Sequence, residues 1–204
     1  TGNRCVVRGL TISGGYAYGQ GGGVYVNNAF VTFDDCVVAA NRVYNGDGWG
    51  QAYGAGLYVK DSQVTMTNCL VRNNRFASAP FYGYGGGMYV SGGNLVVSHS
   101  AVVTNWVAGW YDNTSYGGGI YLAGGSHRIE NTLVADNDGI YADGIYVNAA
   151  VVVRHVTLAR NHGQGLLYAA GSVTATNCIF WGNTDDLAGF PYNEGELNPN
   201  FWYC

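Results

Sequence analysis

The sequence is poor in charged residues, and lysine is nearly missing from it. Only 11% of its 204 residues are charged, Lys60 is the single lysine, and the formal net charge is −4. Proteins that bind nucleic acid need clustered basic side chains to neutralise phosphates. The chain has no basic run, so we expect no nucleic acid among its partners.

Long apolar runs and helical periodicity are missing as well. No stretch approaches the ~20 apolar residues of a membrane-spanning helix, so we expect no membrane span. No segment has the pattern of a secretory signal peptide. We therefore expect any export signal to have been removed or to lie outside this chain. Apolar residues do not recur with a helical period, so no helix is predicted.

Glycine, in contrast, is abundant, with 33 residues, and much of it lies in a repeated phrase. The phrase Gly21-Gly22-Gly23-Val24-Tyr25-Val26 returns in later copies, and in each copy the first apolar residue precedes an Asn by sixteen or seventeen positions. These asparagines are Asn41, Asn74, Asn105, Asn137, Asn161 and Asn183. Repetition at this period indicates a solenoid.

Within each copy, apolar residues alternate with other residues over three short stretches. Val24 and Val26, Val31 and Phe33, and then Cys36 and Val38 share one side in the first full copy. Alternation of this kind predicts short strands with one buried face. Three short strands per repeat predict an all-β parallel β-helix of about seven coils. His127 stands where other copies have Val or Leu, and we expect it to be tolerated near the wall of the core.

Two residue types predict ladders of stacked side chains. We expect each recurrent Asn to occupy a corner in the left-handed conformation and to hydrogen-bond its stacked neighbour. A Tyr lies between the paired inward residues of five copies and must face outward. These residues are Tyr25, Tyr58, Tyr89, Tyr121 and Tyr146. Such an external ladder either stabilises the coils by stacking or serves as a lateral packing face.

The glycine phrase followed by Phe180-Trp181-Gly182-Asn183 resembles the repeats of polymorphic outer-membrane proteins and autotransporter-type adhesins. The opening Gly9-Leu10-Thr11-Ile12-Ser13-Gly14-Gly15 resembles the first coil of right-handed β-helix repeat proteins with the pectin-lyase-like fold. The resemblance covers about residues 5–185 and implies a right-handed parallel β-helix. It implies no particular activity, because that fold carries lyases, hydrolases, adhesins and tailspikes.

All variation in repeat length falls between the Asn and the next strand. These connections contain 8, 15, 13, 14, 7 and 4 residues and should emerge from one corner of the stack. They are rich in aromatic residues, which indicates either a contact surface for glycan or protein or a small core of the loops themselves. The candidate contact residues are Tyr44, Trp49, Tyr53, Phe81, Tyr82, Tyr84, Trp106, Trp110, Tyr111 and Tyr116.

A weaker hypothesis is catalysis. Asp136 aligns with Arg160, and Asp138 aligns with His162, on neighbouring coils. Such pairs place an acid and a base together, as polysaccharide lyases and hydrolases need, but they are also ordinary surface ion pairs. The rest of this row is Arg42, Arg75 and Trp106, with Asp143 nearby in sequence. We therefore assign no catalytic residue, no metal site and no cofactor. Asn113 opens a glycosylation sequon.

The five cysteines are too widely spaced for a metal site. We expect Cys5, Cys36, Cys69 and Cys178 to point inward, and Cys36 and Cys69 to be ladder neighbours that pack as buried thiols. Cys204 lies outside the repeat, where an odd thiol indicates an intermolecular bond or a partner beyond this chain.

The domain organisation follows from the repeat. We predict a β-helix over residues 1–186 and an irregular tail over residues 187–204 that folds over the last coil as a cap. The first coil looks bare, so we expect either a longer chain or copies that stack end to end into a filament. The predicted function is a non-enzymatic structural or adhesive element outside the cell, with a glycan or host-surface ligand. The alternatives are a carbohydrate-active enzyme and a pure glycan-binding module.

Overall fold

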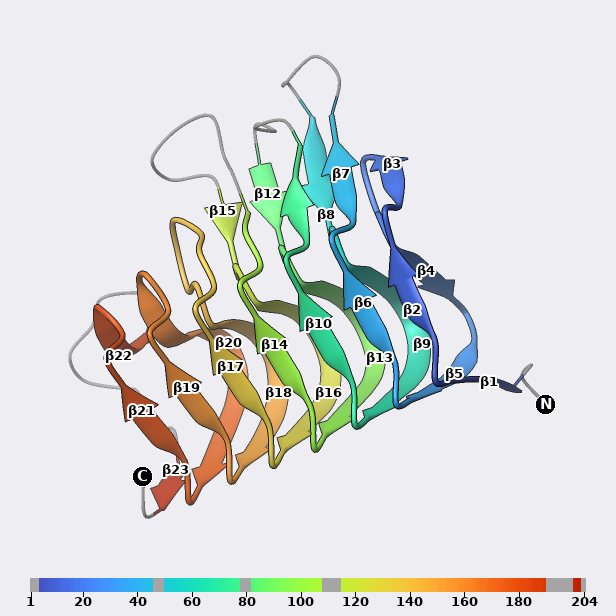
Figure 1. Cartoon of the computed structure of the whole chain (residues 1–204). Helices are drawn as coiled ribbons and strands as arrows, with labels where there is room; N and C mark the ends of the chain where they lie inside the picture. Colours follow the sequence, from blue (N-terminus) through green and yellow to red (C-terminus); the bar gives the residue numbers. More distant parts are fainter. Residues whose placement is uncertain (1–3, 46–49, 78–81, 108–114, 190–199, 203–204) are drawn as a thin grey trace.

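The structure is a computed structural model that describes residues 4–45, 50–77, 82–107, 115–189 and 200–202. In these residues every regular element is a β-strand, and the strands pair in parallel. The chain winds into a row of stacked coils (Figure 1), so the predicted parallel β-helix is confirmed. None of the described segments forms a helix long and apolar enough to cross a membrane. Residues predicted above that lie outside the described ranges are Trp49, Phe81, Trp110, Tyr111, Asn113 and Cys204.

One face of the β-helix is a seven-stranded sheet with one strand from each coil. Its strands, in spatial order, are β2 (Thr11–Ser13), β6 (Val37–Ala39), β10 (Leu70–Arg72), β14 (Ala101–Val103), β17 (Leu133–Ala135), β19 (Thr157–Ala159) and β21 (Ile179–Trp181). The middle residue of each strand points inward, and Val38, Val102 and Leu158 are fully buried. The seven strands confirm the estimate of about seven coils.

The opposite face is a ten-stranded sheet. Its strands are β1 (Arg4–Arg8), β4 (Val24–Asn27), β5 (Phe30–Asp34), β9 (Leu57–Thr67), β13 (Met88–Ser98), β16 (Ile120–Glu130), β18 (Ile145–Arg154), β20 (Gln164–Thr176), β22 (Asp185–Gly189) and β23 (Asn200–Trp202). The expected three short strands per coil hold only where β4 and β5 are separate. From β9 to β20 the first two predicted strands are joined, because pairing continues through the bend, as between Gly93 and Ser62.

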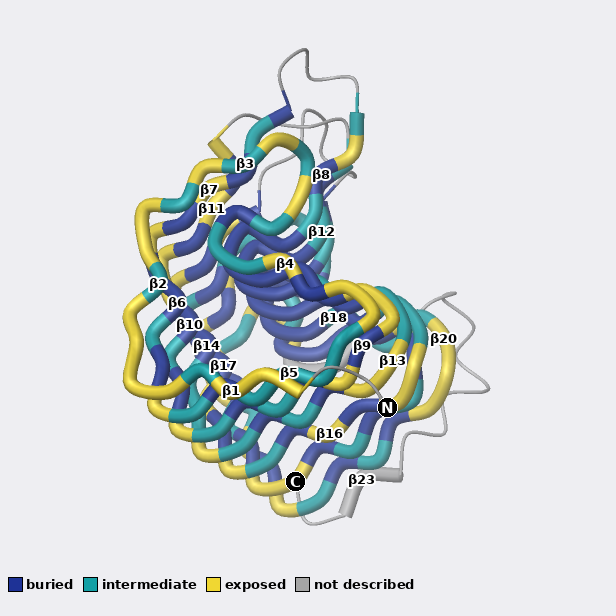
Figure 2. The backbone as a smooth tube through the Cα atoms, turned by 90° about the vertical axis from the view of Figure 1, so that its right-hand side faces the viewer, coloured by how far each residue is buried: buried dark blue, intermediate teal, exposed yellow. Residues whose placement is uncertain are grey.

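The long connections form a layer of their own that projects from one corner of the stack (Figures 1 and 2). We call this layer the protrusion. Its strands are β3 (Tyr16–Tyr18), β7 (Arg42–Tyr44) and β11 (Arg75–Phe76) in one sheet, and β8 (Gln51–Tyr53), β12 (Tyr82–Tyr84) and β15 (Ser115–Tyr116) in another. A separate apolar cluster fills it, made of Val43, Ala52, Ala55, Phe76 and Val107. The single corner and the small loop core are both confirmed in the described residues.

The interior of the coils is apolar, and like residues stack in register. Val64, for example, pairs with Val31 on one side and with Leu95 on the other. Each fully buried aliphatic side chain contributes roughly 1.5–3 kcal/mol. Cys36, Cys69 and Cys178 are buried, and Cys36 and Cys69 form no disulfide, as predicted.

Cys5 has the expected inward register, because it pairs in parallel with Val31, which packs against the core, and it lies outside the column of Cys36. Its side chain is nevertheless exposed, since β1 is the first strand of the described stack and no described strand covers it from the other side. The inward column that contains Cys36 and Cys69 continues instead as Ser100, Thr132, Val156 and Cys178. Those hydroxyls donate to carbonyl oxygens two residues earlier, as the thiols do.

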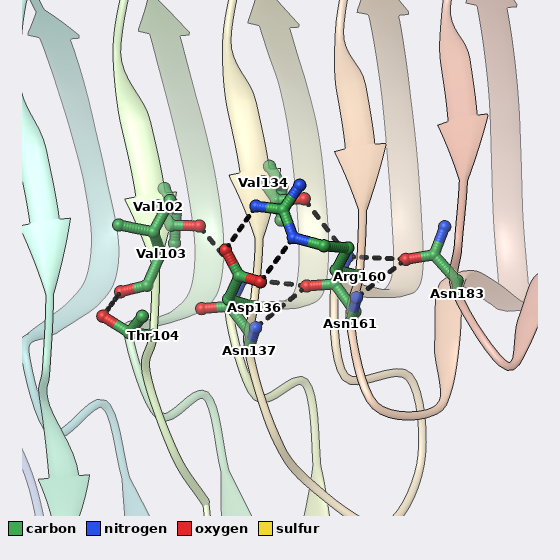
Figure 3. Close-up of polar contacts among 9 residues, drawn as sticks. All are labelled: Val102, Val103, Thr104, Val134, Asp136, Asn137, Arg160, Asn161 and Asn183. Carbon is green, nitrogen blue, oxygen red and sulfur yellow. Dashed lines mark hydrogen bonds and ion pairs between the residues drawn. The ribbon is translucent and has the colours of Figure 1, made fainter.

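The recurrent asparagines form an internal hydrogen-bonded ladder. Their expected left-handed conformation is wrong: the residue before each Asn has the positive φ, 55° at Thr104 and 55° at Asp136. That turn sends the Asn side chain inward, where Asn41, Asn74, Asn105 and Asn137 are fully buried. Nδ2 of Asn137 donates to Val102 O at 3.0 Å and to Oδ1 of Asn161 at 3.1 Å (Figure 3). These polar side chains can be buried because the hydrogen bonds of the ladder satisfy their amide groups.

His127 lies in the wall of the core, as expected, and its two ring nitrogens are engaged. The backbone N–H of Leu95 donates to Nδ1 at 3.2 Å, and Nε2 lies 2.8 Å from the carbonyl oxygen of Gly124. Because Nδ1 accepts a hydrogen bond, the proton sits on Nε2. Burial lowers the pKa of His127, which keeps the ring neutral.

The segment expected to be an irregular tail contains two short strands. Both β22 and β23 pair with β20, so they extend the ten-stranded sheet beyond the last complete coil. The expected end-to-end association of copies, or continuation in a longer chain, stays a prediction.

Candidate functional site

A groove of about 680 Å³ runs along the stack between the seven-stranded sheet and the protrusion. It is open to solvent, and its lining residues come from successive coils. Its lining is Ala40, Arg42, Asn73, Arg75, Thr104, Asn105, Trp106, Asp136, Asp138 and His162. The residues that follow the ladder asparagines, which aligning the repeats placed in one row, therefore line one groove.

The position directly after each ladder Asn supplies one wall of the groove. Arg42 pairs with Arg75, Arg75 with Trp106, and Trp106 with Asp138. His162 continues the row, because its N–H donates to Asn137 O on the preceding coil. Successive members lie about 4.8 Å apart along the stack. The groove therefore presents two cations, one aromatic ring, one carboxylate and one imidazole in linear order.

The Asn ladder fixes the direction of this row. Each Asn is locked inside by bonds to both neighbouring coils, for example Asn105 N–H to Oδ1 of Asn137 at 3.0 Å. Since side chains alternate along extended backbone, the next residue must point out of the coil. Trp106 accordingly is 41% exposed, although it follows a fully buried Asn105.

The two predicted acid–base pairs are present. Arg160 donates from Nε to Oδ1 of Asp136 at 2.8 Å and from Nη2 to Oδ2 at 2.7 Å (Figure 3). This contact raises the pKa of Arg160. Nδ1 of His162 lies 3.5 Å from Oδ2 of Asp138. Both pairs are largely exposed, so they contribute little to stability.

Asp143 is the residue that sequence reasoning undervalued. It is only 2% exposed, and Oδ1 has no hydrogen-bond partner. Burial, and then the charge of Asp138, raise the pKa of this carboxyl to about 6. The carboxyl lies against Gly139 and Gly163, where a Cβ would approach it to 3.1 and 2.9 Å. A signal did exist, because earlier copies have Gly or Ala at this position (Gly22, Ala55, Gly86 and Gly118).

Comparison with known families agrees with this architecture. Residues 1–117 and 110–198 match the family described as right handed beta helix region. The chain belongs to the right-handed β-helix family. Comparison with curated proteins and with solved structures gave no match. The finer resemblance to autotransporter-type repeats stays a prediction.

On the other side of the protrusion, this β-helix carries two rows of stacked tyrosines. The predicted row is present, with ring centroids 5.3 Å apart between Tyr58 and Tyr89 and 4.5 Å apart between Tyr121 and Tyr146. A second row comes from the protrusion, and it consists of Tyr53, Tyr84, Tyr116 and Tyr141.

The two tyrosine rows pack against each other, so the outward ladder serves both expected roles: its rings stack, and it is a lateral packing face for the protrusion. Tyr84 meets Tyr121 edge-on at 5.2 Å, and Tyr53 lies 4.7 Å from Tyr89. Tyr58 and Tyr121 are consequently only 8% and 9% exposed. Burial raises the pKa of Tyr84 to about 12 and raises the pKa of Tyr89 and Tyr121 further. The rows fasten the protrusion to the coils.

The candidate contact residues therefore divide between two surfaces. Trp106 faces the groove, whereas Tyr53, Tyr82, Tyr84 and Tyr116 belong to the tyrosine side. Tyr44 stacks on Tyr16 at 4.8 Å at the amino-terminal end of the protrusion. Among the described residues, no three His, Cys, Asp or Glu side chains are grouped as ligands for a metal ion.

Proposed function

We propose that this β-helix is a rigid, non-enzymatic contact element that acts outside the cell and binds a glycan in its groove. The observation that carries the proposal is the row Arg42, Arg75, Trp106, Asp138 and His162 along one open groove. An exposed indole ring stacks on sugar rings, and flanking charged groups orient hydroxyls by hydrogen bonding. An open groove that crosses several coils suits an extended chain.

The environment of the carboxylates supports a binding role over a catalytic one. General acid–base catalysis needs a carboxyl group within hydrogen-bond reach of the reacting atoms. Asp136 accepts hydrogen bonds from Nε and Nη2 of Arg160, and Asp138 faces His162. Asp143 is buried and does not line the groove.

One observation favours the enzyme as a second candidate. Asp143 and Asp138 are neighbouring carboxyls with different environments, and the pKa of Asp143 is raised to about 6. Carboxyl pairs whose titrations are pushed apart serve as acid and base in many hydrolases. Incubation with a panel of polysaccharides, followed by detection of new reducing ends or unsaturated products, tests this candidate. If a polysaccharide is cleaved, and Asp138→Asn abolishes the cleavage, the protein is an enzyme.

A glycan array followed by titration calorimetry tests the proposed binding. We expect Trp106→Ala to lower the affinity for the bound glycan at least about fivefold, because stacking of a sugar ring on an indole contributes about 1 kcal/mol or more. Trp181→Ala is the matched control, since Trp181 is 62% exposed on β21 but does not line the groove. Equal effects of the two substitutions, or no binding to any glycan, would refute the proposal.

A further inference from the structure

The groove contains an uncompensated pair of cations. Arg42 and Arg75 are exposed and lie in register on β7 and β11. Like charges directly opposite each other on neighbouring strands are destabilising. In the described part of the chain, neither guanidinium has an ion pair or a side-chain hydrogen bond.

Several other arginines of the chain have a carboxylate partner. Arg8 pairs with Asp34 at 2.9 Å, and Arg160 pairs with Asp136 at 2.7 Å. Arg128 lies 3.4 Å from Glu130. Arg4 and Arg72 have no carboxylate partner in the described residues either, but only Arg42 and Arg75 pair with each other in register and line one groove. The two adjacent guanidiniums make a place where an anion can supply the missing negative charge.

The sign of the charge reverses further along the same groove. Asp138 lies two coils beyond Arg75, which corresponds to about 10 Å. Its carboxylate is partly exposed and has His162 at 3.5 Å. Asp143 adds negative charge behind this end at pH values above its pKa of about 6. Trp106 lies between the two ends, in register with Arg75 and with Asp138.

We propose that the groove selects an oligosaccharide with one anionic group at one end and neutral sugar rings beyond it. The anionic oxygens, from a carboxylate or a sulfate, bridge the guanidiniums of Arg42 and Arg75, whose planar forks suit both groups. The next ring stacks on Trp106, and hydroxyls beyond it donate to Asp138. A chain with an anionic group on every ring is disfavoured, because it brings negative charge beside Asp138. This inference rests on the proposed glycan binding.

Four small probes, two disaccharides and two trisaccharides, test the inference by titration calorimetry at pH 7. They are lactose, lactose sulfated on its terminal galactose, sialyllactose and trigalacturonate. We expect the sulfated or the sialylated probe to bind at least about tenfold more tightly than lactose, as a charge-assisted hydrogen bond provides. We expect trigalacturonate to bind more weakly than the better of these two, and added salt to reduce the difference from lactose.

Variants assign the effect to its residues. The double substitution Arg42→Gln with Arg75→Gln should lower the affinity for the singly anionic probe much more than the affinity for lactose, so that the difference between the two probes disappears. Arg42→Lys with Arg75→Lys keeps the charge but loses the planar fork, so an intermediate affinity is expected. Asp138→Asn should raise the affinity for trigalacturonate relative to the affinity for the singly anionic probe, because it removes the negative charge that disfavours the fully anionic chain. Thermal unfolding checks that each variant is folded, which the exposure of these side chains favours.

The outcomes separate the inference from the function on which it rests. If glycans bind through Trp106 but the singly anionic probes are not preferred, or if trigalacturonate is preferred, the inference is overturned and glycan binding still stands. An unchanged preference in the Arg42→Gln, Arg75→Gln variant would overturn it as well. Loss of all binding on the glycan array would remove both.

Discussion

Replacement of Asn105 by Ala tests the internal ladder most directly. The side chain is fully buried and makes four hydrogen bonds. Nδ2 donates to Val71 O at 3.1 Å and to Oδ1 of Asn137 at 3.0 Å. Oδ1 accepts from N–H and Nδ2 of Asn74 at 3.1 and 3.0 Å.

The magnitude follows from the groups that lose their partners. Two of the four partner groups, both in side chains, keep another hydrogen bond in the variant. Asn74 Nδ2 still donates to Val38 O, and Asn137 Oδ1 still accepts from the backbone N–H of residue 105. The N–H of Asn74 is left buried and unpaired, whereas the carbonyl of Val71 stays in the parallel ladder between β10 and β14. An orphaned buried group costs about 1–3 kcal/mol, so we expect Asn105→Ala to lower the free energy of unfolding by about 2 kcal/mol. That is a large fraction of the stability of an ordinary domain.

Urea unfolding followed by circular dichroism measures the loss, and amide hydrogen exchange locates it. Exchange should accelerate first at Asn74, since repeats contact only their neighbours and can open locally. Asn94→Ala is the control: Asn94 lies exposed on β13, so its removal should change stability by less than about 0.5 kcal/mol. A loss below about 1 kcal/mol for Asn105→Ala, with Asn74 still protected, would refute the reasoning.

Three further predictions concern stability. Asp143→Asn should stabilise the protein at pH 8 by up to about 3 kcal/mol but not at pH 3. A carboxyl whose folded pKa is raised to about 6 must be ionised in the folded state above that pH, which lowers the free energy of unfolding. Urea unfolding at a series of pH values measures this, and a difference independent of pH would contradict it. The wild type should lose stability as pH falls below about 6.5, because burial lowers the folded pKa of His127 and the unfolded chain takes up the proton first. His127→Leu should remove this loss, and an identical dependence of stability on pH in both proteins would contradict the prediction. Tyr84→Ala should cost about 3–5 kcal/mol and Tyr84→Phe less than about 1, because stacking rather than the hydroxyl joins the two tyrosine rows; thermal unfolding of both variants measures this, and equal losses would contradict it.

Local alternation was enough to predict the inward residues of the middle coils. Val64, Leu95 and Val151 lie where a period of two places them, because side chains of a strand must alternate. The same rule did not predict that Cys5 is exposed, since burial also requires a neighbouring coil to cover the side chain. It also did not predict that the first two strands of a coil are joined, as in β9 and β13, where pairing continues past Ser62 and Gly93.

The site was predicted only in part. Equal spacing from the ladder Asn was enough to pair Asp136 with Arg160 and Asp138 with His162, and both pairs are present. The same spacing brought Arg42, Arg75 and Trp106 into this row, but it did not indicate a groove. A groove exists only because the protrusion stands beside the seven-stranded sheet, and its position depends on packing between tyrosine rows that are distant in sequence.

The sequence by itself determined the coil, because each repeat carries its own alternation, its turn residues and its Asn, all of which act over short distances. It determined the number of coils and the corner from which the connections emerge for the same reason. Only the tertiary structure decided which outward residues are buried. Tyr58 and Tyr121 face away from their own coil but are covered by the protrusion, and Asp143 is enclosed because Gly139 and Gly163 leave room for it. Burial depends on what the rest of the chain places against a residue, and that information is not local.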